Sequence, residues 1–231
     1  MARRSYSLDV ASNIDATASD ELTVKIASGL GAIDAGQWNA CANPKRGEAD
    51  SSSQPTPYNP FISYAFLSAL EDSRSVGGRT GWSPAHIVVE DSSGTLTAVA
   101  PAYLKSHSQG EYVFDHGWAD AFERAGGDYY PKVQVSVPFT PATGRRLLLR
   151  PGPHSAERRE ALIAGLRALR DRAGASSIHF TFLEKADWDD LGARGFLQRT
   201  DKQFHWINQG YRNFEDFLGA LSSRKRGSTI A

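Results

Sequence analysis

Apolar and polar residues alternate in several stretches of the chain, which is the pattern of a strand with one buried face. Leu22, Val24 and Ile26 form the first such stretch. Residues 85–89 and 96–102 repeat the pattern on either side of a Ser-Ser-Gly turn, which predicts an antiparallel hairpin. Further strands are predicted at 111–115, 133–139, 146–150 and 178–183, and a pair of strands at 196–199 and 203–207. Because 178–183 carries no formal charge, we expect it in the middle of a sheet.

Helical periodicity separates these strands. Ile62, Phe66 and Leu70 recur at the spacing of one buried helix face, after an Asn-Pro pair that suits a helix start. A longer helix is predicted at 155–173, with Gly174 placed to end it. Shorter helices are predicted at 35–42, after Asp187 and after Asn213.

This mixed order predicts an α/β (α+β) fold in which a mainly antiparallel sheet is flanked by helices. Residues 1–20 are small and polar and are expected to form a loose leader. Residues 21–210 would form the folded domain, and 211–231 would begin a helix that leads to a second domain. The predicted core combines strand residues with the apolar face of the long helix: Ile87, Val89, Val133, Val135, Val137, Leu162, Leu166, Leu169, Ile178 and Phe180.

Composition and charge narrow the function classes. The 231 residues contain 26 basic and 26 acidic side chains, so the chain lacks the basic excess typical of nucleic-acid-binding proteins. No apolar run approaches the ~20 residues of a membrane helix, and no secretory signal begins the chain, so we expect a cytoplasmic protein. The single cysteine, Cys41, excludes an internal disulfide and a cysteine-rich zinc site, and no metal is expected.

Motifs of the common enzyme classes are missing. The sequence contains neither a phosphate-binding loop nor a dinucleotide fingerprint, and neither HExxH nor GxSxG occurs. Phosphate-loop enzymes, dinucleotide-dependent dehydrogenases, zinc proteases and typical hydrolases are therefore disfavoured.

The richest chemistry lies between residues 107 and 132. Asp115 and His116 stand together at the end of a predicted strand. A carboxylate beside a histidine can orient it as a general base, which makes these two residues the candidate catalytic pair. The alternative interpretation is a strand with a polar end and a surface histidine.

Aromatic and basic residues around this pair are candidate substrate-binding groups, since tyrosine offers a flat face and a hydroxyl donor. Glycines at 126 and 127 would bring the following residues near the strand end. Alternatively, the tyrosines only cover the sheet, and the histidine at 205 is structural between its aromatic neighbours. The candidate binding set is Tyr112, Trp118, Tyr129, Tyr130, Lys132 and His205.

Several long strings resemble the FemAB-like family of the GNAT acyltransferase superfamily. They include Asn59-Pro60-Phe61-Ile62-Ser63 and the stretches 101–115, 129–141 and 203–206, within a match that runs from about residue 22 to 226. The resemblance implies a GNAT-like fold that is repeated in tandem in the full family pattern. It also implies transfer of an amino acid from aminoacyl-tRNA, or of an acyl group from acyl-CoA, to an amine such as a peptidoglycan precursor.

The sequence departs from this family pattern in two places. The turn at 150–155 contains two prolines and one glycine instead of the GNAT pyrophosphate loop, so we expect no cofactor in this chain. Acyl-CoA or aminoacyl-tRNA would be the donor substrate of the full-length protein. From the resemblance we also expect the second GNAT-like domain to be missing after the basic run at 224–226. Two alternatives to a transferase half therefore stay open: a substrate-binding module, or a truncated, inactive product.

Overall fold

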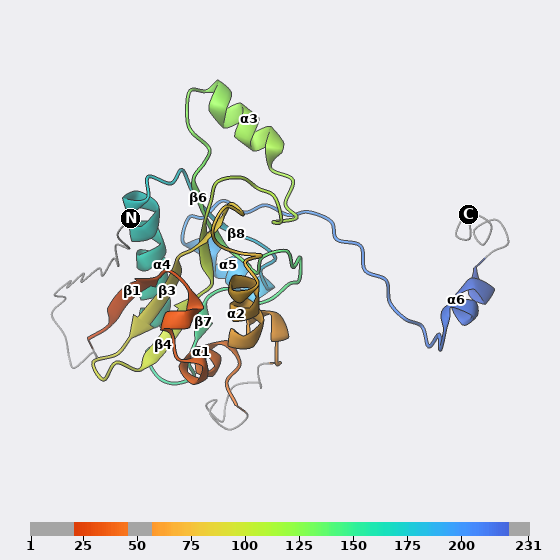
Figure 1. Ribbon diagram of the computed structural model, residues 1–231, viewed down its shortest axis with the longest axis horizontal. Coiled ribbons are helices and arrows are strands. Elements are labelled where there is room, and N and C mark those ends of the chain that lie inside the picture. The colour runs from red at the N-terminus through yellow and green to blue at the C-terminus, as the bar shows by residue number, and fades with distance from the viewer. Residues whose placement is uncertain (1–20, 46–56, 222–231) are drawn as a thin grey trace. The chain divides into compact units, whose positions relative to one another are not determined.

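The computed structural model describes residues 21–45 and 57–221 (Figure 1). The chain divides into two compact units, one up to Gly195 and one from Phe196 onward. Each unit is described by itself below. The predicted leader at 1–20 and the basic run at 224–226 lie outside the described residues, and the predicted domain boundary after residue 210 stays a prediction.

The first unit contains two four-stranded sheets. The first sheet has the order β1-β3-β4-β7 and is antiparallel throughout. The second has the order β2-β5-β6-β8, in which only β8 runs parallel to its neighbour β6. The strands span Thr23–Ala27 (β1), Trp82–Pro84 (β2), His86–Glu90 (β3), Leu96–Ala100 (β4), Ala102–Lys105 (β5), Lys132–Val135 (β6), Leu148–Leu149 (β7) and Ile178–Phe180 (β8).

Helices flank these sheets, which confirms the predicted fold class. The helices of the first unit are Ala35–Ala42 (α1), Tyr64–Asp72 (α2), His116–Arg124 (α3), Ser155–Arg172 (α4) and Lys185–Ala193 (α5), with short 3₁₀ turns at Leu30–Ala32 and Pro60–Ile62. No helix in the described part of the chain is long and apolar enough to cross a membrane.

One long, bent hairpin links the two sheets. The predicted hairpin forms as β3 and β4, and both strands continue past a bend, at Ala85 into β2 and at Pro101 into β5. Pro101 has no backbone N–H, and the N–H of Ala102 donates to Nδ1 of the buried His86 at 3.3 Å. His86 Nε2 lies 2.9 Å from Glu71 Oε1, so the imidazole joins the bend to α2.

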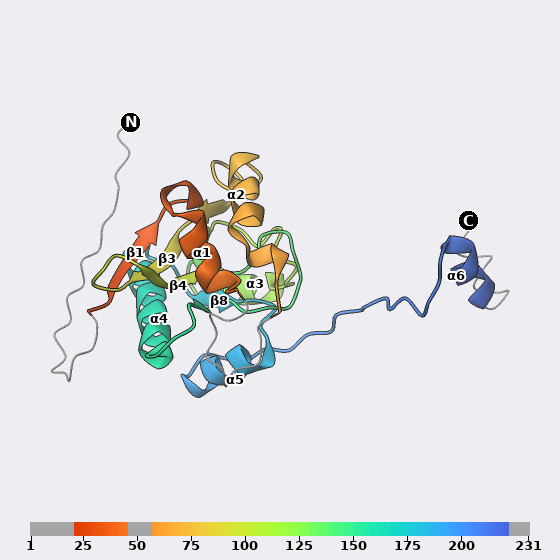
Figure 2. The same ribbon diagram turned by 90° about the horizontal axis from the view of Figure 1, so that it is seen from below.

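The main core lies on both faces of the first sheet. Helix α4 runs along β1, β3 and β4 (Figure 2), and Gly165 allows the close approach. A Cβ at Gly165 would lie only 2.7 Å from Val24 Cγ1 and 2.8 Å from Ile87 Cγ2. On the other face, α1 and α2 close a second apolar cluster: Leu30, Trp38, Cys41, Ala42, Ile62, Leu67, Val88, Leu96, Val99, Val137 and Leu148.

The predicted core is buried except at β8. Ile178 and Phe180 are only half-buried, and the prediction of a central strand at 178–183 is wrong, because β8 pairs with β6 alone among the described strands. The helix predicted to begin after Asp187 begins at Lys185 instead. Asp187 is not a cap because its carboxylate is buried against Arg159 and the backbone N–H of Arg146.

The strand predicted at 111–115 is also wrong. These residues form an irregular loop that leads into α3. Tyr112 has a φ of 55°, in the left-handed region, which cannot continue a strand ladder. The polar groups of the loop bond to side chains instead, as described below.

In the second unit, only α6 (Phe214–Ala220) is regular among the described residues. Asn213 caps it as predicted, accepting a hydrogen bond from the N–H of Asp216. The strand pair predicted at 196–199 and 203–207 does not form. Leu197 and Phe204 are almost fully exposed, so the segment has no buried face to stabilise a pair of strands.

Candidate functional site

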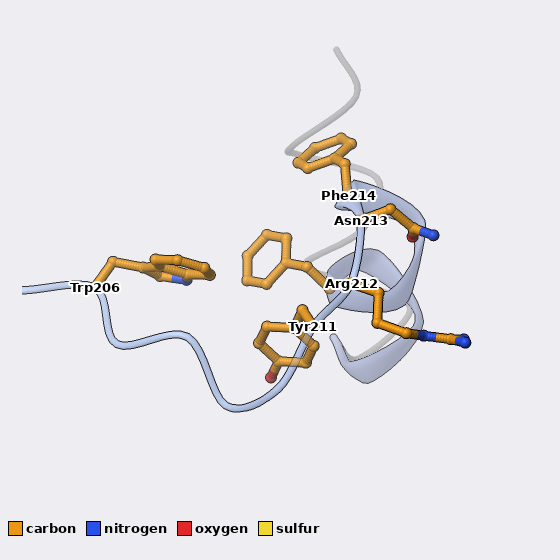
Figure 3. A pocket seen from close by; sticks show the side chains of 6 residues that line it. Trp206, Tyr211, Arg212, Asn213 and Phe214 are labelled. Carbon is orange, nitrogen blue, oxygen red and sulfur yellow. The ribbon is translucent and has the colours of Figure 1, made fainter.

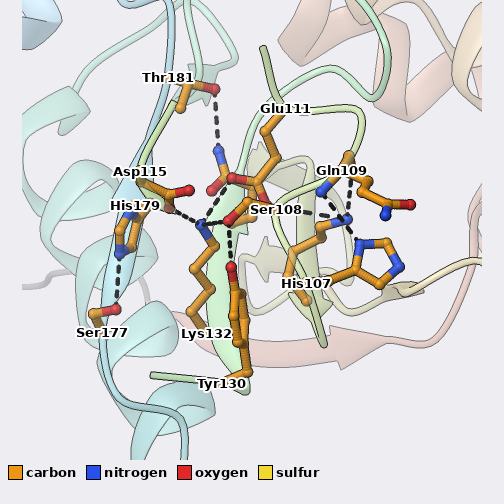
Figure 4. A network of polar contacts seen from close by, with 12 residues as sticks. His107, Ser108, Gln109, Glu111, Asp115, Tyr130, Lys132, Ser177, His179 and Thr181 are labelled. Carbon is orange, nitrogen blue, oxygen red and sulfur yellow. Dashed lines mark hydrogen bonds and ion pairs between the residues drawn. The ribbon is translucent and has the colours of Figure 1, made fainter. Parts of the chain in front are cut away.

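A buried lysine is the centre of the polar groups in the first unit. Lys132 opens β6, and its Nζ donates to Glu111 Oε2 at 2.8 Å, Asp115 Oδ2 at 2.6 Å and Ser108 Oγ at 2.8 Å (Figure 4). The three ammonium protons are therefore all used. The contacts hold the loop before α3 against the second sheet. We call Ser108, Glu111, Asp115, Tyr129, Tyr130, Lys132 and Lys105 the lysine cluster.

Two tyrosines that precede Lys132 complete this arrangement. The Tyr129 hydroxyl donates to Asp115 Oδ2 at 2.9 Å, and the Tyr130 hydroxyl lies 2.7 Å from Ser108 Oγ. Asp115 Oδ2 thus accepts from both Lys132 and Tyr129. The tyrosines contact two of the three loop residues that Lys132 contacts, so the loop is anchored twice at Ser108 and at Asp115 and once at Glu111.

A second buried lysine lies directly opposite the first. Lys105 on β5 is in register with Lys132, and its Nζ lies 3.6 Å from the centre of the Trp82 ring. It donates to the carbonyl of Gln109 at 3.2 Å and lies 4.0 Å from Glu111 Oε1. Burial lowers the pKa of Lys105 to about 8, against the opposing charge of Glu111 and with a smaller contribution from the charge of Lys132.

The two carboxylates that share Lys132 are shifted in opposite directions. Burial raises the pKa of Glu111 above its ordinary value, despite the neighbouring lysines. Burial would also raise the pKa of Asp115, but the hydrogen bonds and the charge of Lys132 outweigh it and leave that pKa lowered. Glu111 Oε1 and Asp115 Oδ1 are buried without a hydrogen-bond partner among the described residues.

A histidine on β8 lies beside the cluster. The His179 ring is 6.0 Å from the Tyr129 ring, and its Nε2 lies 2.8 Å from Ser177 Oγ. Burial lowers the pKa of His179 to about 4, and the charge of Lys132 contributes, so the imidazole is neutral at pH 7. The described residues include no group of three His, Cys, Asp or Glu side chains arranged to hold a metal ion.

The structure brings four predicted site residues together and separates three others from them. Asp115, Tyr129, Tyr130 and Lys132 meet in the lysine cluster. Tyr112, His116 and Trp118 are exposed instead. His205 belongs to the second unit, where its Nε2 lies 2.9 Å from Gln203 Oε1.

The predicted orientation of His116 by Asp115 needs correction. The Asp115 carboxylate points inward to Lys132 and Tyr129, whereas His116 is an exposed residue in the first turn of α3. The bonds to Lys132 and Tyr129 keep the carboxylate buried, while the side chain of His116 is open to solvent. Asp115 therefore anchors the backbone before His116 and does not hold its imidazole.

The second unit has an aromatic hollow of about 430 Å³ (Figure 3). Its rings contact one another, with Trp206 6.1 Å from Phe217 and Tyr211 5.6 Å from Phe217. Arg212 at its edge is paired with Asp216. The lining residues are Trp206, Tyr211, Arg212, Asn213, Phe214 and Phe217.

The solved structures that match this chain include two acetyltransferases of low sequence identity. An acetyltransferase from Trypanosoma brucei shares 12% identity with a TM-score of 0.40, over 81% of this chain and all of that one. Aminoglycoside N-acetyltransferase AAC(6')-Iy, solved in complex with CoA, shares 11% identity with a TM-score of 0.44, over 84% of this chain and 99% of that one. No curated protein matches the chain.

A protein-family model matches most of the sequence. The model is described as FemAB-like, peptidoglycan biosynthesis/recognition, and it matches residues 29–229. This match confirms the resemblance seen in the sequence and supports the acyl- or aminoacyl-transferase-like role that the resemblance implies. The chain therefore belongs to the FemAB-like family.

Proposed function

We propose that the chain acts in acyl or aminoacyl transfer to the amine of a peptidoglycan precursor or a related small molecule. The observation that carries the proposal is the family match over residues 29–229. The lysine cluster supports it, because a buried ionic network fixes a loop and helix start that carry exposed chemical groups. Such groups need a rigid support if they are to meet a substrate in one geometry.

His116 is the proposed general base. An amine acceptor must lose a proton before or while its nitrogen attacks the acyl carbonyl, and a neutral imidazole can accept that proton near pH 7. The new bond forms between nitrogen and the carbonyl carbon, and the bond from that carbon to the donor sulfur or oxygen breaks. The imidazolium then returns its proton to the leaving group. Asp115 acts in this scheme as a positioning residue for the start of α3.

Substrate contacts are assigned to the exposed aromatic side chains. Tyr112 and Trp118 flank His116 in the sequence and are open to solvent. His205 stays a candidate binding residue of the second unit. Tyr129, Tyr130 and Lys132 are assigned to support because their polar atoms are bonded within the lysine cluster.

Acyl-CoA or aminoacyl-tRNA is the proposed donor, and the cytoplasm the proposed compartment. The turn before α4 offers few N–H groups to a pyrophosphate, since Pro151 and Pro153 have none and His154 enters the helix with a left-handed φ of 62°. We therefore expect weak binding of acetyl-CoA to this chain. A calorimetric Kd at or below about 1 μM would contradict that expectation.

Transfer of a labelled acyl or aminoacyl group to an amine-bearing peptidoglycan stem peptide tests the proposal, with mass spectrometry of the product. The substitution His116→Ala should lower the rate by roughly 10²–10⁴-fold. His154→Asn is the matched control, since asparagine accepts the left-handed backbone and that side chain is exposed. Absence of transfer from either donor would leave a substrate-binding module, and an unchanged rate in His116→Ala would exclude His116 as the base.

A further inference from the structure

The lysine cluster joins two surfaces of opposite charge. Its cations, Lys105 and Lys132, belong to strands of the second sheet, and both side chains are fully buried. Its anions, Glu111 and Asp115, belong to one irregular loop that lies against that sheet. The positive charges are therefore held by a strand ladder, whereas the negative charges are carried by a segment that has no regular backbone pairing.

The two lysines are placed in a way that requires an anion. Lys105 and Lys132 lie directly opposite each other on antiparallel β5 and β6, and their Nζ atoms lie 4.0 Å and 2.8 Å from the Glu111 carboxylate. Like charges directly opposite each other destabilise a sheet. Burial strengthens the repulsion, since the interior screens charge poorly. This face of the sheet is therefore stable only with negative charge bound to it.

The other polar groups on the sheet side of this contact are also donors. They include the hydroxyl groups of Tyr129 and Tyr130, immediately before β6, and the indole N–H of Trp82 on β2. The Trp82 Nε1 atom is buried and has no hydrogen-bond partner among the described residues. It faces the loop, since a Cβ on Gly110 would lie 3.2 Å from it. The sheet side thus offers two cations and three further donors to an oxyanion.

The loop satisfies these donors incompletely. Glu111 Oε1 and Asp115 Oδ1 are buried and accept no hydrogen bond from the described residues. Lys105 Nζ donates one hydrogen bond within the same part of the chain, to the carbonyl of Gln109. Burial raises the pKa of Glu111 despite the lysines, so its charge is poorly compensated. An anion that satisfies the donors more fully can therefore displace the loop carboxylates.

The segment that carries the carboxylates is loosely attached elsewhere. Figure 1 shows α3 standing clear of both sheets, and Ala119 is its one buried residue. No other helix or strand packs extensively on α3 within the described part of the chain. Gly110 and Gly126, with φ values of 79° and 87°, flank the segment at backbone conformations that favour glycine. We call residues 110–126 the lid.

We infer that Lys105 and Lys132 form a binding site for a compact oxyanion, a phosphate or a carboxylate, which the lid closes with its own carboxylates. In the closed arrangement Glu111 and Asp115 occupy the place of the ligand. A bound anion replaces their bonds to Lys132 and releases the lid, and His116 moves with it. The site is thus autoinhibited, and the inference does not depend on the proposed transfer.

Calorimetric titration with pyrophosphate and with malonate, at constant ionic strength, tests this site. Glu111→Gln removes one competing charge and keeps the side-chain shape, so it should bind one of these anions about tenfold or more tightly than wild type does. Adding Lys105→Met, whose thioether can pack on the Trp82 ring, should abolish saturable binding. Glu123→Gln is the matched control, since it makes the same charge change at an exposed position of α3.

Hydrogen–deuterium exchange tests whether the anion opens the lid. With Glu111→Gln saturated by the anion, backbone amides at 110–126 should exchange at least about tenfold faster than without it, and amides of β3 and β4 should not change. An ion bound only at the surface would not accelerate exchange there. If circular dichroism shows that Glu111→Gln is unfolded, Asp115→Asn takes its place, because it removes the other competing charge.

The outcomes are independent of the proposed function, since neither experiment needs an acyl donor. Tighter binding by Glu111→Gln, its loss on adding Lys105→Met and faster exchange in the lid support the site whether or not transfer is detected. Preference for pyrophosphate or for malonate then identifies a phosphate or a carboxylate ligand. The inference is overturned if Glu111→Gln binds neither anion or binds no more tightly than Glu123→Gln. Binding that survives Lys105→Met, or unchanged or slower exchange at 110–126, also overturns it.

Discussion

Two buried regions of the first unit differ in chemistry: the contact between α4 and the first sheet is apolar, and the lysine cluster is ionic. The first joins Gly165 to Val24 and Ile87 through methyl groups in close contact. The second joins Lys132 to Glu111 and Asp115 through charged atoms. Apolar contacts stabilise a fold in proportion to the area they bury, whereas buried charges must first lose their water.

The difference indicates what each region is for. A buried ionic cluster contributes little net stability compared with apolar residues of the same volume, but it fixes geometry through directed bonds. In this chain the bonds determine where residues 108–116 lie and which of their side chains face solvent. The apolar core holds the unit together, and the lysine cluster holds the candidate site in place.

The largest expected effect comes from removing the shared ammonium group. Lys132→Met leaves the carboxylates of Glu111 and Asp115 buried without their main partner and should lower the free energy of unfolding by about 3–5 kcal/mol. Urea denaturation, monitored by circular dichroism, measures this change in the free energy of unfolding. Lys185→Met is the control, because Lys185 is exposed and its contacts with Asp189 and the Trp188 ring lie on the surface of α5; it should change stability by less than about 0.5 kcal/mol. A Lys132→Met effect as small as the control would show that water already solvates the cluster.

The two carboxylates should respond differently to pH. The folded pKa of Asp115 lies below its ordinary value of 3.8, so its charge stabilises the fold above about pH 4 and this contribution is lost as the pH falls through the lowered pKa. The folded pKa of Glu111 lies above its ordinary 4.5, so its contribution is present below about pH 4.5 and lost as the pH rises through the raised pKa.

Amide substitutions separate these two contributions. Asp115→Asn should cost about 1.5–3 kcal/mol at pH 7, with the difference from wild type shrinking toward pH 3. Glu111→Gln should lower the free energy of unfolding by less. The stability of this variant relative to wild type should improve from pH 4 to pH 7, because wild type loses the contribution of Glu111 over that range. Denaturation series at fixed pH values measure both. Parallel pH profiles for the two variants would refute the opposite shifts.

The smallest expected effect comes from a change at the apolar contact between α4 and the first sheet. Gly165→Ala would bring a Cβ within 2.8 Å of the Val24 and Ile87 side chains, so it should destabilise by about 1–3 kcal/mol although alanine favours helices. Gly117→Ala on α3 meets no atom within 4 Å and should be neutral or stabilising by up to about 1 kcal/mol. Equal thermal midpoints for the two variants would mean that α4 does not press on the sheet as closely as described.

The sequence predicted the parts of the fold that follow from local pattern. Alternation located β1, β3 and β4, and the helical period located α2 and α4. The pattern at 111–115 was misleading for a physical reason. Alternating polar and aromatic residues satisfy the strand rule whichever set faces inward, and only the bonds to Lys132 show that the carboxylates are inside.

The candidate site was predictable in part. Asp115, Tyr129, Tyr130 and Lys132 are close in sequence and were expected together. Lys105, Ser108 and His179 reach the same place through the pairing of β5, β6 and β8, and a single sequence does not specify that register. A charged residue within an apolar strand, as at Lys105, was the one available signal. His116 was misplaced because the start of α3 was taken for a strand end.

Hydrogen–deuterium exchange of wild type and Lys132→Met tests most directly whether the lysine cluster holds the candidate site. Under conditions where the variant stays folded, backbone amides at 108–124 should exchange at least about tenfold faster in Lys132→Met, because the loop and α3 lose their anchor. The exchange rates of amides in β3 and β4 should change only by the common factor that the change in global stability sets. A uniform acceleration across the whole unit, or unchanged exchange at 108–124, would contradict the account.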